Sequence, residues 1–364
     1  MATTHPWTDR QGLVEHCGAG GQLHGPRTGD RRLKDLLYPW LERQLTHLLT
    51  QKGHAWLIQG PSGLGQYELA LHLAKAWLCE QPKPTGACHH CSSCHGFDVR
   101  TNPDFFALMP EVEMIDLEWP LNEKIQRDLD KKERKPSKEI KVDACRELIT
   151  FSQTTRSGLA GKVAMVYPAE RMNPVTANTL LKTLEEPPEG FKFVLSTSAA
   201  HLLLPTIRSR CQTYTITWPS KAESLQWLMD KGLSAEHAQV WLQATGNRPV
   251  DALDMAHHSG LTPEDWLRLP QSVASGSVSL LKEFTAPQTV NLLQKICFDM
   301  LCMVEGAQPR YFSAKGLPHG ASLKALSEWS KSLISSAQTA NHPYNLGLLQ
   351  EALVSQAKHY MMRH

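Results

Sequence analysis

The sequence has almost no net charge and no long apolar run. Its 38 Lys and Arg side chains nearly balance 36 Asp and Glu, so the formal net charge is +2, and this balance provides no strong attraction to nucleic acid or to a membrane surface. No stretch approaches the roughly 18 consecutive apolar residues of a membrane span, and the N-terminus lacks the apolar core of an export signal. We therefore expect a cytoplasmic protein. If it acts on DNA, it does so through an assembly.

The apolar content is typical of a folded protein with more than one domain. With 364 residues and 41% apolar side chains, the chain is long enough for two or three domains. Short apolar runs predict strands at residues 55–58, 105–109, 163–166, 193–196 and 213–216. Helical patterns lie between them, at residues 68–78, 143–153 and 176–184. Asp143 is expected to cap the second of these helices. Strands that alternate with helices predict a parallel sheet covered on both faces.

The rest of the chain divides by composition. Residues 1–36 are rich in Gly, His, Arg and Asp without periodicity, so we predict a disordered extension. The strand signal covers residues 37–219, whereas residues 220–262 predict a small helical bundle and residues 263–364 remain helical. Residues 111–139 carry dense charge of both signs and predict a solvated surface insertion. One buried face of the last helix is expected to comprise Leu346, Leu349, Leu353 and Tyr360.

A glycine-rich turn after the first predicted strand has the spacing of a phosphate-binding loop. Such loops have two glycines five positions apart, followed by Lys and then Ser or Thr. Gly60 and Gly65 keep this spacing and Gly63 adds flexibility, so the backbone can still form an anion-binding nest at a helix N-terminus. Gln66 replaces the Lys that neutralises the phosphates, and Tyr67 replaces the small hydroxyl residue that binds Mg²⁺.

The second half of an ATPase site is also missing. The strand at residues 163–166 should be followed by an acidic pair that binds Mg²⁺ and activates water, but Tyr167 and Pro168 stand there. Two losses that affect one site predict a loop that keeps its shape but hydrolyses no ATP. A chance glycine turn is the alternative, and the strand–loop–helix context argues against it.

Four of the nine cysteines have the spacing of a metal site. Cys79 lies at the end of the helix that follows the loop, and Cys88, Cys91 and Cys94 form tandem C-x-x-C turns. Because disulfides are rare in the cytoplasm, four converging thiolates predict a closed, structural zinc site. Free thiols or a redox pair are the alternatives. Nearby histidines that could replace a ligand are His89, His90 and His95.

Two further segments produce a specific family resemblance. Residues 177–188 read ANTLLKTLEEPP, and Ser209-Arg210-Cys211 follows some twenty residues later. These motifs resemble the clamp-loader branch of AAA+ proteins, and the resemblance covers about residues 37–260. The cysteine module resembles the gamma/tau and delta-prime subunits of bacterial DNA polymerase III. The broken phosphate loop resembles delta-prime rather than gamma/tau.

The resemblance implies a domain plan and a set of partners. It implies an AAA+ α/β domain at residues 37–219 with a zinc module at residues 79–95, a helical lid at residues 220–262 and a helical collar at residues 263–364. The chain would be a subunit without its own ATPase activity. Its partners would be gamma/tau and delta subunits in a hetero-oligomer that loads the beta sliding clamp onto primed DNA.

The resemblance also assigns roles to individual side chains. It implies that Arg210 reaches across a subunit interface to the ATP of a neighbouring subunit, where a cation stabilises the charge of the transition state. Without the resemblance, an Arg at a strand edge indicates a structural ion pair, and Arg208 is the second candidate for the finger. Thr197 and Arg248 stand where AAA+ proteins usually have two nucleotide sensors.

Two other function classes fit parts of the sequence. An active clamp-loader ATPase of gamma/tau type would need the missing Lys and acidic residues, and ATP binding by the isolated chain would favour it. A zinc-dependent DNA-binding module has less support, because the cysteine segment lacks an aromatic or basic recognition surface and the chain is nearly neutral.

Overall fold

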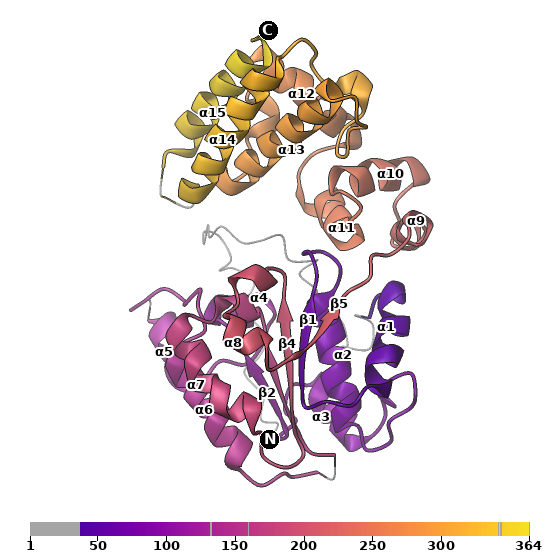
Figure 1. Ribbon diagram of the computed structural model, residues 1–364, viewed down its shortest axis with the longest axis vertical. Helices are drawn as coiled ribbons and strands as arrows, with labels where there is room; N and C mark the ends of the chain where they lie inside the picture. Colours follow the sequence, from indigo (N-terminus) through magenta and orange to yellow (C-terminus); the bar gives the residue numbers. More distant parts are fainter. Residues whose placement is uncertain (1–36, 132, 159, 341, 343, 364) are drawn as a thin grey trace, which may run out of the picture. The chain divides into compact units, whose positions relative to one another are not determined.

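The computed structural model describes residues 37–363, apart from positions 132, 159, 341 and 343. The predicted extension at residues 1–36, which includes Cys17, lies outside these residues. The described chain forms two compact units that separate between His258 and Ser259 (Figure 1). The first unit contains the sheet and every candidate site residue, and the second is helical.

The first unit is built on a five-stranded parallel sheet with the strand order β2-β3-β4-β1-β5. Strand β1 lies between β4 and β5, so Leu57 is opposite both Leu195 and Thr213. The predicted fold class is confirmed, and each strand lies within two residues of its predicted range. The strands are β1 (Ala55–Gln59), β2 (Phe105–Leu108), β3 (Lys162–Val166), β4 (Phe191–Thr197) and β5 (Gln212–Thr215).

Helices cover both faces of this sheet, as a parallel sheet requires. One face carries α1 (Pro39–Thr50), α2 (Gln66–Leu78) and α3 (Ser92–Asp98), and the other carries α6 (Val142–Gln153) and α7 (Pro174–Glu185) (Figure 1). The helix α8 (Pro205–Arg208) precedes β5. The core beneath α6 and α7 contains fully buried Leu148, Leu180, Leu184 and Phe193.

Local sequence determines how α7 begins, whereas the predicted start of α6 is wrong. Asn173 caps α7 by accepting a hydrogen bond from the backbone N–H of Thr176, and Pro174 occupies the first helical turn. Helix α6 begins at Val142 with Lys141 as its N-cap. Asp143 therefore lies in the first turn and pairs with Arg146 at 3.2 Å. An acidic side chain there is favoured by the helix dipole without capping the helix.

The charged insertion is more ordered and more buried than its composition predicts. It contains α4 (Glu111–Asp116) and α5 (Glu123–Asp130). The Glu111 carboxylate is buried and accepts hydrogen bonds from both terminal nitrogens of Arg134 and from Lys141 Nζ at 2.7 Å. Trp119 is also buried. The prediction of a solvated surface insertion therefore holds for most of the described residues of this segment but not for Glu111, Glu113 and Trp119, which are buried.

Replacing Glu111 with Gln is expected to destabilise the first unit by about 1.5–3 kcal/mol at neutral pH, since buried hydrogen bonds to charged groups contribute on this order. Burial opposes ionisation, but bonds from Arg134 and Lys141 lower the pKa of Glu111 to about 2. Its unfolded pKa is about 4.3. The stabilisation is therefore complete above that value and is lost as the pH falls toward 2.

Urea unfolding of the wild type and the Glu111→Gln variant at pH 7 and pH 3 measures this contribution. The difference in unfolding free energy should shrink at pH 3. Glu123→Gln is the matched control, because Glu123 is 93% exposed in its pair with Arg127 and such pairs contribute about 0–1 kcal/mol. Equal destabilisation by the two variants would contradict the assignment.

The remaining helices follow the sheet. Ser220 and Glu223 form a capping box at the start of α9. Among the described residues, no helix is both long and apolar enough to cross a bilayer. The first unit ends with α9 (Lys221–Asp230), α10 (Ala235–Ala244) and α11 (Pro249–His258). The second unit contains α12 (Pro263–Ser275), α13 (Ala286–Val304), α14 (Leu323–Thr339) and α15 (Leu346–Met361).

The predicted face of α15 is only partly correct: Leu353 is buried and Leu349 and Tyr360 are half-buried, but Leu346 is exposed. The side chains that α15 buries are Gln350, Leu353, Val354, Ala357 and Met361. Gln350 is the reason for the shift in register. Its Nε2 donates to the carbonyl oxygens of Leu281 and Phe284 at 2.7 and 2.9 Å. A polar residue that is buried because it satisfies backbone acceptors is invisible to apolar periodicity.

Candidate functional site

The phosphate loop keeps its backbone shape at the carboxyl end of β1. Gly63 and Gly65 both have positive φ, at 80° and 96°, and Gly65 is the N-cap of α2. A Cβ at Gly65 would lie 2.7 Å from Tyr38 Cδ2, and one at Gly63 would collide with the carboxylate of Asp251. Only glycine fits these two positions. The loop geometry predicted from the glycine spacing therefore has a steric basis in the fold.

The side chain of Gln66 folds back onto the loop instead of serving a ligand. Its Nε2 donates to the carbonyl oxygens of both Gly60 and Pro61, and the residue is 6% exposed. An amide that bridges two backbone acceptors stabilises the loop but supplies no positive charge. The position that would neutralise phosphate oxygens is therefore occupied by a neutral group whose donors are used within the protein.

Tyr67 and Tyr167 pack against each other. In the sequence they stand at two separate positions, that of the hydroxyl residue that binds Mg²⁺ and that of the acidic pair. Their ring centroids are 4.9 Å apart. Trp119 Nε1 donates to the Tyr67 hydroxyl at 2.7 Å. Burial raises the pKa of both tyrosine hydroxyls well above the usual value, so both remain neutral phenols. The residue at the position of the metal-binding hydroxyl is therefore a buried phenol with a hydrogen-bond partner inside the protein.

Trp119 is a site residue that sequence reasoning missed. It comes from the charged insertion, and its ring also packs on Phe105 at 5.6 Å and beneath the Arg100 guanidinium at 4.8 Å. The only sequence signal is a Trp in an otherwise charged segment, which does not identify its partner. The insertion contributes directly to the interior of the degenerate site.

The helices after the sheet contact the loop from its other side. Arg248, just before α11, donates from Nη1 to Ser62 Oγ at 2.8 Å and lies 2.9 Å from Asp251 Oδ2. The Asp251 side chain is 5% exposed and lies against Gly63. The Arg248 guanidinium and the Asp251 carboxylate thus form a neutral ion pair that packs against the loop. At the other sensor position, Thr197 Oγ1 donates to Glu170 Oε2 at 2.6 Å.

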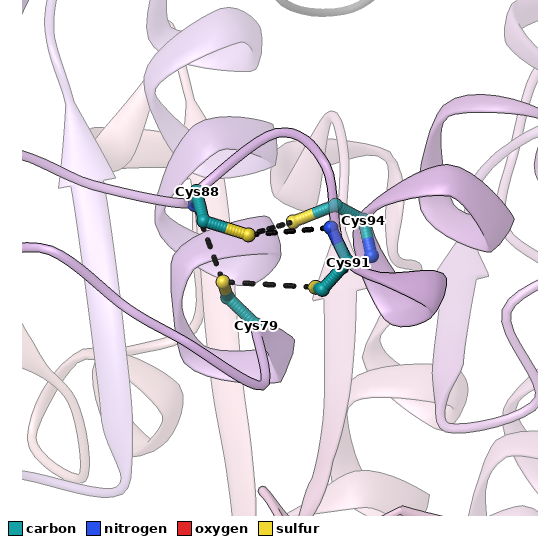
Figure 2. Close-up of side chains that lie close together, drawn as sticks. All are labelled: Cys79, Cys88, Cys91 and Cys94. Carbon is teal, nitrogen blue, oxygen red and sulfur yellow. Dashed lines mark hydrogen bonds between the residues drawn. The ribbon is translucent and has the colours of Figure 1, made fainter.

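The four cysteines predicted as metal ligands converge at the end of α2 (Figure 2). Cys79 Sγ lies 3.9 Å from Cys91 Sγ, and Cys88 Sγ lies 3.9 Å from Cys94 Sγ. A tetrahedral zinc with Zn–S bonds of about 2.3 Å separates its sulfurs by about 3.8 Å. All four sulfurs lie within 4.8 Å of one another, so the spacing fits one zinc ion. His89, His90 and His95 are not part of this group.

Hydrogen bonds to sulfur favour the thiolate form of Cys88, whereas burial raises the pKa of Cys79 and of Cys94. The backbone N–H groups of Cys88, Cys91 and Cys94 donate to the sulfurs of Cys79, Cys88 and Cys91 at 3.2–3.4 Å. Burial opposes ionisation of Cys88, but backbone donors from His90 and Cys91 lower its pKa to about 6. Metal-bound thiolates commonly receive such bonds, which orient the ligand and tune the site.

A buried ion pair joins the cysteine module to the phosphate-loop helix. Lys75 on α2 is 1% exposed, and its Nζ lies 2.5 Å from Asp98 Oδ1 at the end of α3. The module also buries Ala76 and Ala87 with the four cysteines. A small module without a large core of its own is thereby fastened to the sheet domain at two places.

The predicted finger residue Arg210 lies between α8 and β5 and is paired within the chain. Its Nε and Nη2 donate to Glu185 Oε2 at 2.9 and 2.8 Å, and its Nη1 donates to the Thr206 carbonyl at 3.1 Å. The Arg210 side chain is 30% exposed and Glu185 is 57% exposed. Arg208 is exposed. Arg210 and the phosphate loop are thus separate features of the first unit.

Comparisons with known proteins give the family. A family model described as "DNA polymerase III, delta subunit" matches residues 39–219. DNA polymerase III subunit delta' of Pseudomonas aeruginosa is 33% identical over 252 residues, which are 68% of this chain and 68% of that protein. The chain belongs to the delta-prime family of DNA polymerase III subunits. The Escherichia coli delta' subunit is 30% identical over 283 residues, 74% of this chain and 78% of that protein.

The delta-prime assignment confirms the predicted resemblance. The chain is also similar to the tau subunit of Bacillus subtilis DNA polymerase III, at 29% identity over 202 residues, which are 55% of this chain and 31% of that protein. A delta-prime protein is thus related in sequence to another subunit of the same polymerase. The identity to the two delta' proteins covers more of the chain than the identity to tau.

Proposed function

We propose that this delta-prime protein is a clamp-loader subunit that hydrolyses no ATP and supplies Arg210 to the nucleotide of a neighbouring subunit. It would act in the cytoplasm, in a hetero-oligomer with gamma/tau and delta subunits that loads the beta sliding clamp onto primed DNA. A structural zinc ion would be held by Cys79, Cys88, Cys91 and Cys94. The similarity to delta' and tau proteins supports the partners.

The main support for the proposal that ATP is not hydrolysed is the packing of side chains at the phosphate loop. The rings of Tyr67 and Tyr167 pack against each other at a tilt of 45°, and Trp119 donates to the Tyr67 hydroxyl. The Gln66 amide donates to two carbonyl oxygens of the loop, and the carboxylate of Asp251 lies against the loop. The loop therefore lacks both the lysine charge and the metal-binding hydroxyl that Mg²⁺-triphosphate requires.

The isolated chain is expected to bind ATP more weakly than about 1 mM, a free energy above about −4.1 kcal/mol, and to release no phosphate. Calorimetric titration with Mg²⁺-ATP and a phosphate-release assay measure this. The Gln66→Lys/Tyr67→Thr variant restores the loop side chains. It is expected to remain inactive, because Tyr167 and Pro168 still replace the acidic pair.

The same experiment tests the alternative of an active gamma/tau-type ATPase. Measurable Mg²⁺-dependent phosphate release by the wild-type chain would establish that alternative and end the present proposal. Binding of ATP without turnover would leave the loop as a nucleotide-binding site but not a catalytic one. Tryptophan fluorescence gives an independent readout, since the Trp119 indole contacts Tyr67 and nucleotide entry would disturb that contact.

The accessibility of Arg210 supports its proposed role. A finger acting in trans must be partly exposed in the free subunit and must carry a permanent charge. Arg210 is 30% exposed, and a guanidinium remains protonated at any physiological pH. Its place between α8 and β5, away from the aromatic cluster of the loop, is consistent with action on the nucleotide of another subunit.

A further inference from the structure

The contacts of Arg210 leave two of its guanidinium N–H donors available. A guanidinium carries five N–H donors. Glu185 takes the Nε–H and one N–H of Nη2, and the Thr206 carbonyl takes one N–H of Nη1. Among the described residues, one N–H on each terminal nitrogen therefore has no acceptor. Guanidinium N–H donors of this kind match the oxygens of a phosphate group.

The two acceptors come from different helices and fix the guanidinium from two sides. Glu185 is the last residue of α7, and Thr206 lies in α8. An unrestrained Arg side chain loses rotamer entropy when it is immobilised. Contacts that hold the Arg210 guanidinium in place before the neighbouring subunit binds reduce this loss of entropy. A charge that is already positioned stabilises a transition state more effectively.

The ion pair itself contributes little to folding. Glu185 is 57% exposed and Arg210 is 30% exposed, and ion pairs in such environments contribute little to protein stability. Glu185 therefore adds little to stability and leaves N–H donors of Arg210 free to bind phosphate. These two features are better explained if Glu185 orients the Arg210 side chain than if it stabilises the fold.

We infer that Glu185 is a positioning residue for the Arg210 finger: it holds the guanidinium so that its two remaining N–H donors face the nucleotide of the neighbouring subunit. This inference rests on the proposed function of Arg210. Glu185 touches neither ATP nor its phosphates and acts only through Arg210.

The test uses a clamp loader reconstituted with the full chain and measures DNA- and clamp-stimulated ATP turnover. Glu185→Ala is expected to lower kcat roughly tenfold, as misplacement of a catalytic group does, with KM for ATP unchanged. Glu185→Gln retains an acceptor of the same size and is expected to give an intermediate rate. Glu186→Gln is the matched control, because Glu186 is the exposed neighbour, and it should match the wild type.

A double-mutant cycle separates positioning from other effects. In an Arg210→Ala background, Glu185→Ala is expected to cause no further loss. An additional loss there, an unchanged rate for Glu185→Ala alone, or a faster rate would overturn the inference. If Arg210→Ala itself leaves turnover unchanged, the proposed finger fails as well. A loss with Arg210→Ala but none with Glu185→Ala removes only the positioning role.

Discussion

Replacing Arg210 with Ala is expected to slow ATP hydrolysis by about 10³-fold at the one nucleotide site that this subunit faces, the lower end of the range for arginine fingers. The loss arises because the γ-phosphate charge that builds up in the transition state would have no fixed cation beside it. Clamp loading should fall with it. Single-turnover hydrolysis in the reconstituted loader resolves the affected site from the others.

Two matched variants make this prediction specific. Arg208→Ala removes an exposed guanidinium two positions away and is expected to leave turnover unchanged. Arg210→Lys keeps the charge but loses the fork that Glu185 and phosphate oxygens require, so it should behave more like Ala than like Arg. Thermal unfolding should shift little, because the Arg210–Glu185 pair is largely exposed. A selective loss with Arg208→Ala would move the finger to that residue.

Loss of the metal is expected to unfold the cysteine module and to produce the largest local change in stability. The purified chain should contain about one equivalent of zinc. The Cys88→Ser/Cys91→Ser variant should contain almost none, because the two remaining thiolates cannot close a tetrahedron. Zinc binding contributes on the order of 10 kcal/mol to folding in small zinc modules, more than this module can replace with its small core.

Metal analysis and hydrogen exchange measure the two parts of this prediction. Exchange should rise at residues 79–98, whereas the strands of the sheet should remain protected. Cys302→Ser is the matched control, since Cys302 lies in α13 and outside the cysteine group, and it should keep a full equivalent of metal. Less than half an equivalent of zinc in the wild-type chain would refute the zinc assignment.

The parts of the site that could be predicted from sequence are those whose residues lie close together in the chain. For such residues, the spacing along the chain determines how they are arranged in space. Gly60 and Gly65 lie in one short loop, so their separation describes a backbone shape. Cys88, Cys91 and Cys94 lie on consecutive turns, and their sulfurs converge as the spacing requires. The helix predicted at residues 176–184 likewise lies within α7 (Pro174–Glu185), although its predicted start is two residues too late.

Predictions failed where a side chain is held by a partner distant in sequence. Glu111 is buried because Arg134 and Lys141 return to it, and Gln350 is buried because Leu281 and Phe284 offer carbonyl oxygens. Composition and apolar periodicity assign both residues to the surface. A polar side chain becomes an interior residue only when its acceptors or donors are brought to it, and those partners are known only in the folded chain.

By itself, the sequence established that a phosphate loop had lost its lysine, its hydroxyl and its acidic pair, and that four cysteines could share one metal. Both conclusions concern which side chains are present at given positions, and the sequence gives this information directly. The tertiary structure decided what replaced the lost groups. It brought Trp119 to Tyr67, Tyr167 to Tyr67 and Asp251 to Gly63. It also brought Glu185 to Arg210. Each pair joins segments far apart in the chain, and packing of the sheet with its helices brings them together.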